Sequence, residues 1–259
     1  METEFCRLET DGRILTVTID RPKVMNALHP AASYELAQVF DEFESDPELW
    51  VAIVTGAGDR AFCAGLDLKS QASSDKLPDA PPTGFAGLTE RYGGTKPIVA
   101  AVNGIAAGGG FEIALACDVV VAAETARFSL PEPRIGLAAL AGGIHRLSRE
   151  IPLKHAMGML LTGRSVMAAE GFQLGFVNEV AKPEELMDVA RHWAEQIAAC
   201  APLSILATKE CAIEGMKHGT VKEAMNAHYP AIDRMVASED FVEGPKAFVE
   251  KRPANWKGR

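Results

Sequence analysis

The sequence predicts a protein of the α/β class that ends in a run of helices. Short apolar strands alternate with helical patterns in the first half of the chain, and helical patterns dominate from Gly142 onward. The chain has 259 residues, of which 47% are hydrophobic and 24% charged. This length and composition are enough to bury one large core without disulfide bonds.

The predicted elements follow from the spacing of apolar residues. Residues 14–19 alternate like a strand, and residues 30–43 carry apolar side chains at helical spacing. Further buried strands are predicted at 51–55, 98–102 and 119–122, and loops at 60–69 and 71–82. Further helices are predicted at 109–116, 184–199, 203–215 and 221–236.

The segment 98–123 is nearly uncharged, so a membrane span has to be considered. A transmembrane helix needs roughly 20 apolar residues without interruption. Asn103, Gly104 and the three glycines at 108–110 interrupt this segment. The pattern therefore favours a strand, a turn, a buried helix and a second strand, and no membrane partner is expected.

Charge and cysteine content exclude several classes of function. The formal net charge of −9 argues against a protein that tracks nucleic-acid phosphates, so no nucleic-acid partner is expected. Five scattered cysteines without a CxxC pair argue against a disulfide scaffold and favour a reducing compartment. The acidic N-terminal segment METEFCRLETDGR is unlike a secretory or mitochondrial signal, so a cytoplasmic location is expected.

Glu112 is the first candidate catalytic residue. It lies in the helical segment GGGFEIALAC, which is apolar on every side and should therefore be buried. A buried carboxylate is costly unless it is paired, hydrogen-bonded or functional. The structural alternative is capping, because Glu112 lies in the first turn of the helix, where negative charge is favourable.

Backbone groups near Glu112 form a candidate anion site. The glycines at 108–110 let a ligand approach the backbone, and free N–H groups at the start of the helix can bind a developing oxyanion. A tight turn would explain the same glycines. The loop AFCAGLDLK (61–69) offers a second N–H donor, with polar contacts from Asp67 and Lys69. Cys63 fits a buried apolar filler better than a nucleophile, because no histidine is near it in sequence.

Glu132 is the second candidate catalytic residue. It lies between Pro131 and Pro133, which stiffen the local backbone. An acid held on a stiff loop is suited to proton transfer, although an ordinary surface glutamate would give the same pattern. Arg134 is then either its partner or a solvated side chain.

Two cofactor classes are not expected. Gly56, Gly58 and Ala61 satisfy the dinucleotide pattern GxGxxG/A after a strand. The segment does not open directly into a helix, however, and the required acidic residue would fall at Asp75 or Asp79 in a proline-rich loop. The histidines show no metal-ligand spacing such as HExxH, so no metal site is predicted.

Several motifs occur in a fixed order along the chain. They read RPKVMNAL (21–28), VTGAGDRAFCAGLDLK (54–69), KPIVAAVNGIAAGGGFEIALACD (96–118), ARFSLPEPRIGL (126–137), AGGIHRL (141–147), LLTGR (160–164), LGFVNEV (174–180) and DFVEGPKAFVEKRPANWKGR (240–259). With these motifs the chain resembles the crotonase, or enoyl-CoA hydratase/isomerase, superfamily over essentially its whole length.

The resemblance implies a crotonase-like spiral of ββα units over residues 1–195, which would hold the CoA site and the active site. It implies a helical trimerisation region over residues 196–259, and hence a homotrimer or homohexamer. The implied substrate is an acyl-CoA, in which coenzyme A is part of the substrate, so no separate cofactor is expected.

The resemblance also assigns site residues. Leu66 and Gly109 match the positions of the two backbone donors of the family's oxyanion hole, and Glu112 and Glu132 match both glutamates of the hydratases. The implied CoA contacts are Lys23, Ala64, Asp67, Lys69, Phe248 and Lys251, the last from a neighbouring subunit.

The chain differs from simple fatty-acyl hydratases in one motif, which typically has the sequence GTIPGAGGTQRL in those enzymes. Residues 136–147 read GLAALAGGIHRL, so the pocket wall should be altered and more apolar. The C-terminal motif and LPEPRIGL look more like the carnitinyl-CoA dehydratase branch. A trimethylammonium group needs an aromatic or acidic cage, for which Phe85, Glu90 and Tyr92 are candidates.

The resemblance thus predicts an enoyl-CoA hydratase, with Glu112 activating water and Glu132 exchanging a proton at Cα. The alternatives within the fold are a carnitinyl-CoA dehydratase and a Δ3,Δ2-enoyl-CoA isomerase, which would leave one glutamate unexplained. A more remote alternative is a non-catalytic relative that binds acyl-CoA or RNA, although the acidic net charge disfavours RNA binding. Another is thioester hydrolysis through Glu112 or Cys63.

Overall fold

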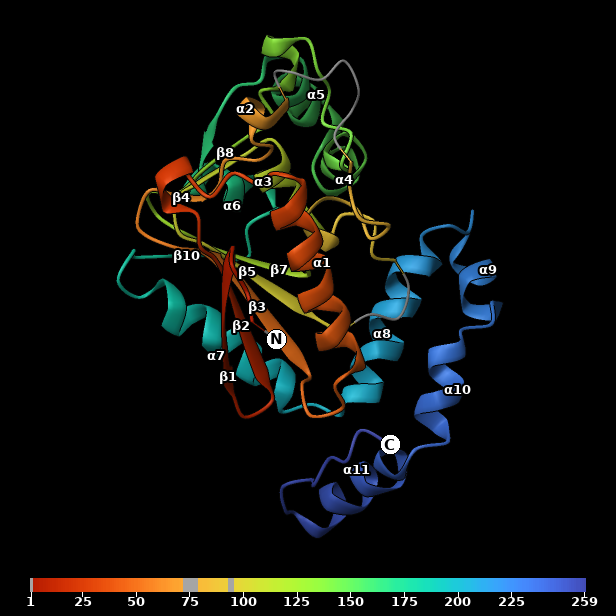
Figure 1. Ribbon diagram of the computed structural model, residues 1–259. Coiled ribbons are helices and arrows are strands. Elements are labelled where there is room, and N and C mark those ends of the chain that lie inside the picture. The colour runs from red at the N-terminus through yellow and green to blue at the C-terminus, as the bar shows by residue number, and fades with distance from the viewer. Residues whose placement is uncertain (1, 72–78, 93–95) are drawn as a thin grey trace.

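Two β-sheets form the body of the molecule in this computed structural model, which describes residues 2–71, 79–92 and 96–259 (Figure 1). The larger sheet has six strands in the described part, in the order β1-β2-β3-β5-β7-β10. They span Cys6–Asp11, Ile14–Ile19, Val51–Gly56, Ile98–Val102, Val119–Ala123 and Glu179–Ala181. The smaller sheet, in the order β4-β6-β8-β9, spans Ala61–Cys63, Ile105–Ala107, Arg127–Ser129 and Val166–Met167.

The chain visits the two sheets in alternation. β3, β5 and β7 of the larger sheet are followed by β4, β6 and β8 of the smaller one, and neighbours along each of these series pair in parallel. β3 and β5 are buried along their whole length, as expected for parallel strands covered on both faces. This is the predicted α/β spiral, and the fold class is confirmed.

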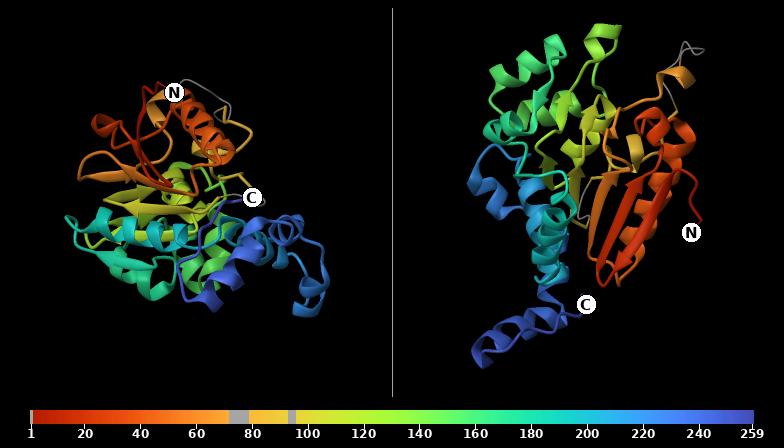
Figure 2. Two further views of the ribbon diagram at one scale, coloured as in Figure 1. Left: turned by 90° about the horizontal axis from the view of Figure 1, so that it is seen from below. Right: turned by 90° about the vertical axis from the view of Figure 1, so that its left-hand side faces the viewer.

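Helices cover the sheets. α1 (Pro30–Ser45) buries one apolar face in the core, and α7 (Leu186–Ala198) packs against β3, β5 and β7 (Figure 2). The remaining helices of the body are α2 (Leu68–Gln71), α3 (Gly109–Ala116), α4 (Gly143–Glu150), α5 (Leu153–Thr162) and α6 (Ala168–Leu174), with short 3-10 turns η1 (Pro22–Val24), η2 (Phe85–Gly87) and η3 (Glu132–Ile135).

Of the last helices, α8 (Pro202–Gly215) lies against the body, where Lys209 forms an ion pair with Asp118 at 2.8 Å. The helices α9 (Val221–Asn226), α10 (Pro230–Val236) and α11 (Glu239–Glu250) extend away from the sheets (Figures 1 and 2). The prediction of continuous helix over 221–236 is wrong, because residues 227 and 229 are extended and Pro230 restarts the chain in a new helix. The proposed boundary at residue 195 stays a prediction.

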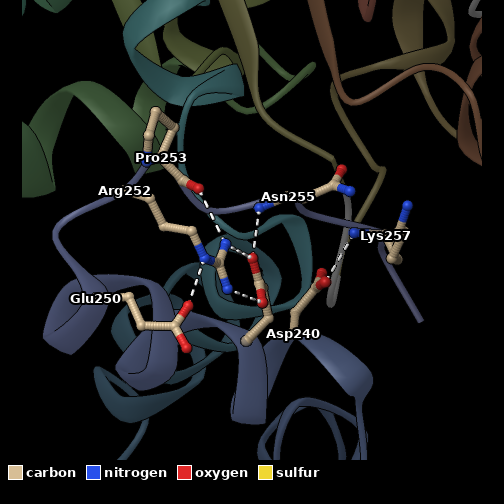
Figure 3. Close-up of polar contacts among 7 residues, drawn as sticks. Asp240, Glu250, Arg252, Pro253, Asn255 and Lys257 are labelled. Carbon is tan, nitrogen blue, oxygen red and sulfur yellow. Dashed lines mark hydrogen bonds and ion pairs between the residues drawn. The ribbon is translucent and has the colours of Figure 1, made fainter.

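The chain after α11 folds back onto that helix (Figure 3). The Arg252 guanidinium donates to both carboxylate oxygens of Glu243, at 2.6 and 2.9 Å, and to Glu250 at 2.6 Å. Asp240, which is buried, accepts a hydrogen bond from the backbone N–H of Lys257 at 2.7 Å. These contacts fix the C-terminal segment to α11.

The predicted loop at 60–69 is partly wrong. Its first residues form β4, and its end enters α2. β4 takes its hydrogen bonds from β6, about forty residues later in the chain, so no local pattern could indicate it. Residues 72–78 of the predicted loop at 71–82, including Asp75, lie outside the described residues.

The segment 98–123 folds as predicted, with β5, α3 and β7, and contains β6 in addition. Within residues 2–71, 79–92 and 96–259, none of the helices combines the length and apolar character required to cross a membrane.

Candidate active site

The start of α3 is packed backbone to backbone against the loop after β4. The N-cap residue Gly108 has φ 54° and ψ −127°, a conformation that side chains disfavour. A Cβ on Gly110 would come to 1.8 Å from the carbonyl oxygen of Cys63, and a Cβ on Gly65 to 2.9 Å from the amide nitrogen of Gly109. Glycine at these positions therefore lets the two chain segments touch.

The contact places Gly65, the residue before Leu66, against the amide of Gly109. On one side of the loop, Leu28 donates to the carbonyl of Gly65 at 2.8 Å and Asp67 donates to the carbonyl of Leu28 at 2.9 Å. This bridge turns the intervening N–H of Leu66 away from Leu28. Leu66 therefore directly follows the glycine that touches the start of α3, and its role as an oxyanion donor together with Gly109 stays a prediction.

An aromatic cluster packs α3 against the neighbouring segments. The ring of Phe111 on α3 lies 5.2 Å from Phe128 and 5.1 Å from Phe176, measured between ring centroids, and these two rings lie 5.2 Å apart. Phe111 and Phe128 are fully buried. Such clusters bury large apolar areas in fixed geometry, so the start of α3 is held rigidly.

Glu112 points out of α3 toward the start of α4. Its side chain is 4% exposed, and its Oε1 accepts a hydrogen bond from the backbone N–H of Gly143 at 2.8 Å. The carboxylate therefore accepts from the first residue of α4, while Glu112 itself lies in the first turn of α3, as the capping alternative requires. Burial raises its pKa to about 7, and the charge of Glu132 adds to the increase, while the N–H of Gly143 and the charge of Arg146 oppose it.

Glu132 lies beside the start of α3, close to its N-cap residue Gly108. It is the first residue of η3, and its Oε1 lies 3.0 Å from where a Cβ on Gly108 would be. Burial raises its pKa above the ordinary value. Its Oε2 is buried and finds no hydrogen-bond donor within the described residues. Such an atom is suited to meet a bound molecule.

The arrangement is suited to acid–base chemistry beside a developing negative charge. Two neighbouring backbone N–H groups can stabilise an oxyanion, and each such donor is typically worth about 3–4 kcal/mol in a transition state. The charge of Glu132 contributes to raising the pKa of Glu112 to about 7. Near neutral pH Glu112 can therefore both accept and deliver a proton.

The predicted CoA residues in the first part of the chain come together. Ala64 donates to the carbonyl of Met25 at 3.0 Å, which joins the segment of Lys23 to that of Asp67 and Lys69. Both lysines are exposed. Asp67 forms an ion pair with Arg21 at 3.5 Å. This ion pair joins the segment of Asp67 to that of Arg21.

Phe248 and Lys251 lie on α11 and directly after it, away from the other site residues of the same chain (Figure 1). Phe248 is 85% exposed. The predicted contact from Lys251 belongs to a neighbouring subunit, so it stays a prediction.

Sequence reasoning missed the contacts of Phe85 and Gly143. A Cβ on Gly109 would lie 2.5 Å from the Phe85 ring, so this ring covers the start of α3. Of the three cage candidates, Phe85 is at the site, whereas Glu90 and Tyr92 are exposed. The resemblance drew attention to the segment 136–147, but no local pattern indicates that its backbone meets Glu112.

Glu112→Gln is expected to stabilise the fold at alkaline pH. Because the folded state raises the pKa from 4.5 to about 7, the stability contributed by Glu112 is complete below pH 4.5 and is lost as pH rises through 7. A glutamine does not titrate, so the gain should be roughly 2–4 kcal/mol at pH 8.5 and small at pH 5.

Thermal melts at the two pH values measure this gain, with Glu124→Gln at an exposed turn as the matched control. An equal change in Tm at both pH values would show that Glu112 has an ordinary pKa.

Comparison with known proteins adds the wider context. The sequence profile described as "Enoyl-CoA hydratase/isomerase" matches residues 9–259. A carnitinyl-CoA dehydratase of Escherichia coli O157:H7 is 45% identical over 266 residues, covering 99% of this chain and 100% of the relative. The structure of an enoyl-CoA hydratase from Mycobacterium tuberculosis H37Rv is 39% identical with a TM-score of 0.90, covering 98% and 99% of the two chains. A carnitinyl-CoA hydratase from Mycobacterium avium is also 39% identical, with a TM-score of 0.78 and full coverage of both chains.

Proposed function

The chain belongs to the enoyl-CoA hydratase/isomerase family, and from this premise we propose that it adds water to, and removes water from, an acyl-CoA thioester. One observation carries the proposal: two buried or half-buried carboxyls, Glu112 and Glu132, flank the start of the helix that presents the N–H of Gly109. An isomerase needs one base to move a proton, which would leave the second carboxyl without a role.

In the proposed hydration, the N–H groups of Leu66 and Gly109 hold the thioester oxygen. Glu112 takes a proton from water while the water oxygen bonds to Cβ, and the charge that develops on the thioester oxygen is stabilised by the two amides. Glu132 then delivers a proton to Cα. In the reverse reaction Glu132 removes the Cα proton, and Glu112 protonates the departing hydroxyl group.

The CoA portion is proposed to lie over the segments 21–28 and 63–69. Lys23 and Lys69 would face the phosphates, and Ala64 and Asp67 would border the adenine. We assign Phe248 and Lys251 to a CoA contact made across a subunit boundary in a homotrimer or homohexamer. The high exposure of Phe248, Val249 and Val242 on α11 supports burial of this helix against another copy.

Among possible acyl groups, we propose the carnitinyl/crotonobetainyl pair. The support is the 45% identity to carnitinyl-CoA dehydratases over 99% of this chain, together with the Phe85 ring beside Gly109. An aromatic face can bind a trimethylammonium group by a cation–π interaction. A simple straight-chain enoyl group is the second candidate, because hydratases of that general name are close structural relatives.

The test is hydration of crotonobetainyl-CoA, crotonyl-CoA and octenoyl-CoA, each followed by the loss of enoyl-thioester absorbance. We expect kcat/KM for crotonobetainyl-CoA to exceed that for crotonyl-CoA by about 5- to 30-fold, since one cation–π contact is worth roughly 1–2 kcal/mol. Preference for crotonyl-CoA would replace the carnitinyl assignment. No turnover of any ester, despite tight binding, would overturn the hydratase proposal itself.

A further inference from the structure

Arg146, on the first turn of α4, lies where three segments of the candidate site meet. It is partly buried, its guanidinium reaches the η2 loop and the turn before α4, and its charge acts on Glu112. We propose that Arg146 is a positioning residue, which holds the Gly142–Gly143 turn and the Glu112 carboxyl in register with the loop that carries Phe85. The inference rests on the proposed function and extends it.

The first contact of Arg146 is with the Phe85 loop. Its Nη2 donates to the carbonyl of Thr89 at 2.9 Å, and Thr89 is 1% exposed. The hydroxyl of Thr89 in turn accepts a hydrogen bond from the backbone N–H of Phe85 at 2.8 Å. Arg146 therefore donates a hydrogen bond to the carbonyl of Thr89, the buried residue that orients Phe85.

The second contact is with the turn that binds Glu112. The backbone N–H of Arg146 donates to the carbonyl of Gly142 at 2.8 Å, and its Nη1 lies so close to Gly142 that a Cβ there would come within 2.1 Å. Gly142 has φ 101°, which glycine adopts readily. The next residue, Gly143, donates to Glu112 at 2.8 Å. The Arg146 side chain thus packs against the residue that precedes the amide bound to Glu112.

The positive charge of Arg146 also acts on Glu112. The charged groups that influence Glu112 are Glu132 from η3, which disfavours its ionised form, and Arg146 from α4, which favours it. The charge of Arg146 also acts on Glu150 at the end of α4. Because Glu112 is buried, a nearby cation is weakly screened there and affects its ionisation more than it would at the surface.

The experiment compares Arg146→Met, which removes the charge, with Arg146→Lys, which keeps it. The matched control is Arg149→Met, because Arg149 lies on the same helix, is exposed, and also donates to a backbone carbonyl, that of His145 at 2.8 Å. Two readouts are used for each variant: turnover of the preferred ester, and titration of Glu112 in the ligand-free protein by infrared difference against Glu112→Gln.

We expect Arg146→Met to lower kcat about 10- to 100-fold, because small misplacement of a catalytic group costs this much, with less than about threefold change in KM. Its Glu112 titration should move to higher pH. Arg146→Lys should restore the titration but only part of kcat, and Arg149→Met should change neither.

Unchanged kcat and an unchanged titration in Arg146→Met would overturn the proposal. Equal losses in Arg146→Met and Arg149→Met would also overturn it, since they would indicate a general effect on α4. If Arg146→Met fails to fold, the Lys variant decides: full kcat would contradict the positioning role. The titration needs no substrate, so it tests Arg146 even if the proposed reaction is wrong.

Discussion

Glu112→Gln and Glu132→Gln are each expected to lower kcat for hydration by roughly 10²–10⁴-fold, the usual contribution of a general acid or base. Glutamine keeps the shape of the side chain and can still accept from the N–H of Gly143, but it cannot carry the proton. The CoA ester contacts other parts of the site in the proposed mode, so its Kd should change little.

The double variant gives a sharper result. If the two carboxyls act on one water and one Cα proton, removing both should cost little more than removing either, because residues that act as a unit are not additive. Steady-state kinetics of the single and double variants measure this, with Glu124→Gln as the exposed control. Near-parental turnover in either single variant would remove that residue from the mechanism.

Gly110→Ala is expected to destabilise the protein by about 3 kcal/mol or more, at or above the upper end of ordinary overpacking. The added Cβ would come to 1.8 Å from the backbone carbonyl oxygen of Cys63, and a backbone atom cannot rotate away. The loop before Leu66 or the start of α3 must shift. Residual folded protein should therefore lose at least about 100-fold in kcat, because the two N–H donors lose their alignment.

Gly158→Ala is the matched control for this substitution. Gly158 lies within α5, and a Cβ there would meet nothing within 4 Å. Replacing a glycine in a helix by alanine typically stabilises by about 0.5–1 kcal/mol. Urea unfolding should thus move in opposite directions for the two variants. A mild effect of Gly110→Ala, comparable to that of Gly158→Ala, would show that the contact with Cys63 is not tight.

The sequence predicts those strands of the larger sheet that are buried on both faces, such as β3 and β5, because such burial produces a continuous run of apolar residues. It also predicts Glu112 as unusual, since a lone carboxylate in an apolar helix stands out without any partner being known. It does not predict β4 or β6, which have three residues each and obtain their hydrogen bonds from distant segments. Short strands of this kind are specified by pairing and not by periodicity.

The environment of Glu112 could not be predicted for the same reason. Gly143 is 31 residues later in the chain, and its backbone N–H carries no signal in the amino-acid letters. Arg146 and Phe85 likewise reach the site through contacts with backbone atoms of other segments. The residues alone indicated both glutamates, Glu112 on a helix and Glu132 on a stiff loop, and the resemblance added their expected roles. Only the fold brings Glu132 to the start of α3.

The predicted pairing of the Leu66 and Gly109 amides has a consequence for how such a protein can change. Their N–H groups belong to the main chain, so a side-chain replacement at Leu66 does not delete the donor. The pocket wall predicted over 136–147 differs in this respect: Leu137 and Leu140, between η3 and α4, are exposed side chains that can be exchanged individually. For the proposed function, we therefore expect point mutations to change the substrate range more readily than the reaction itself.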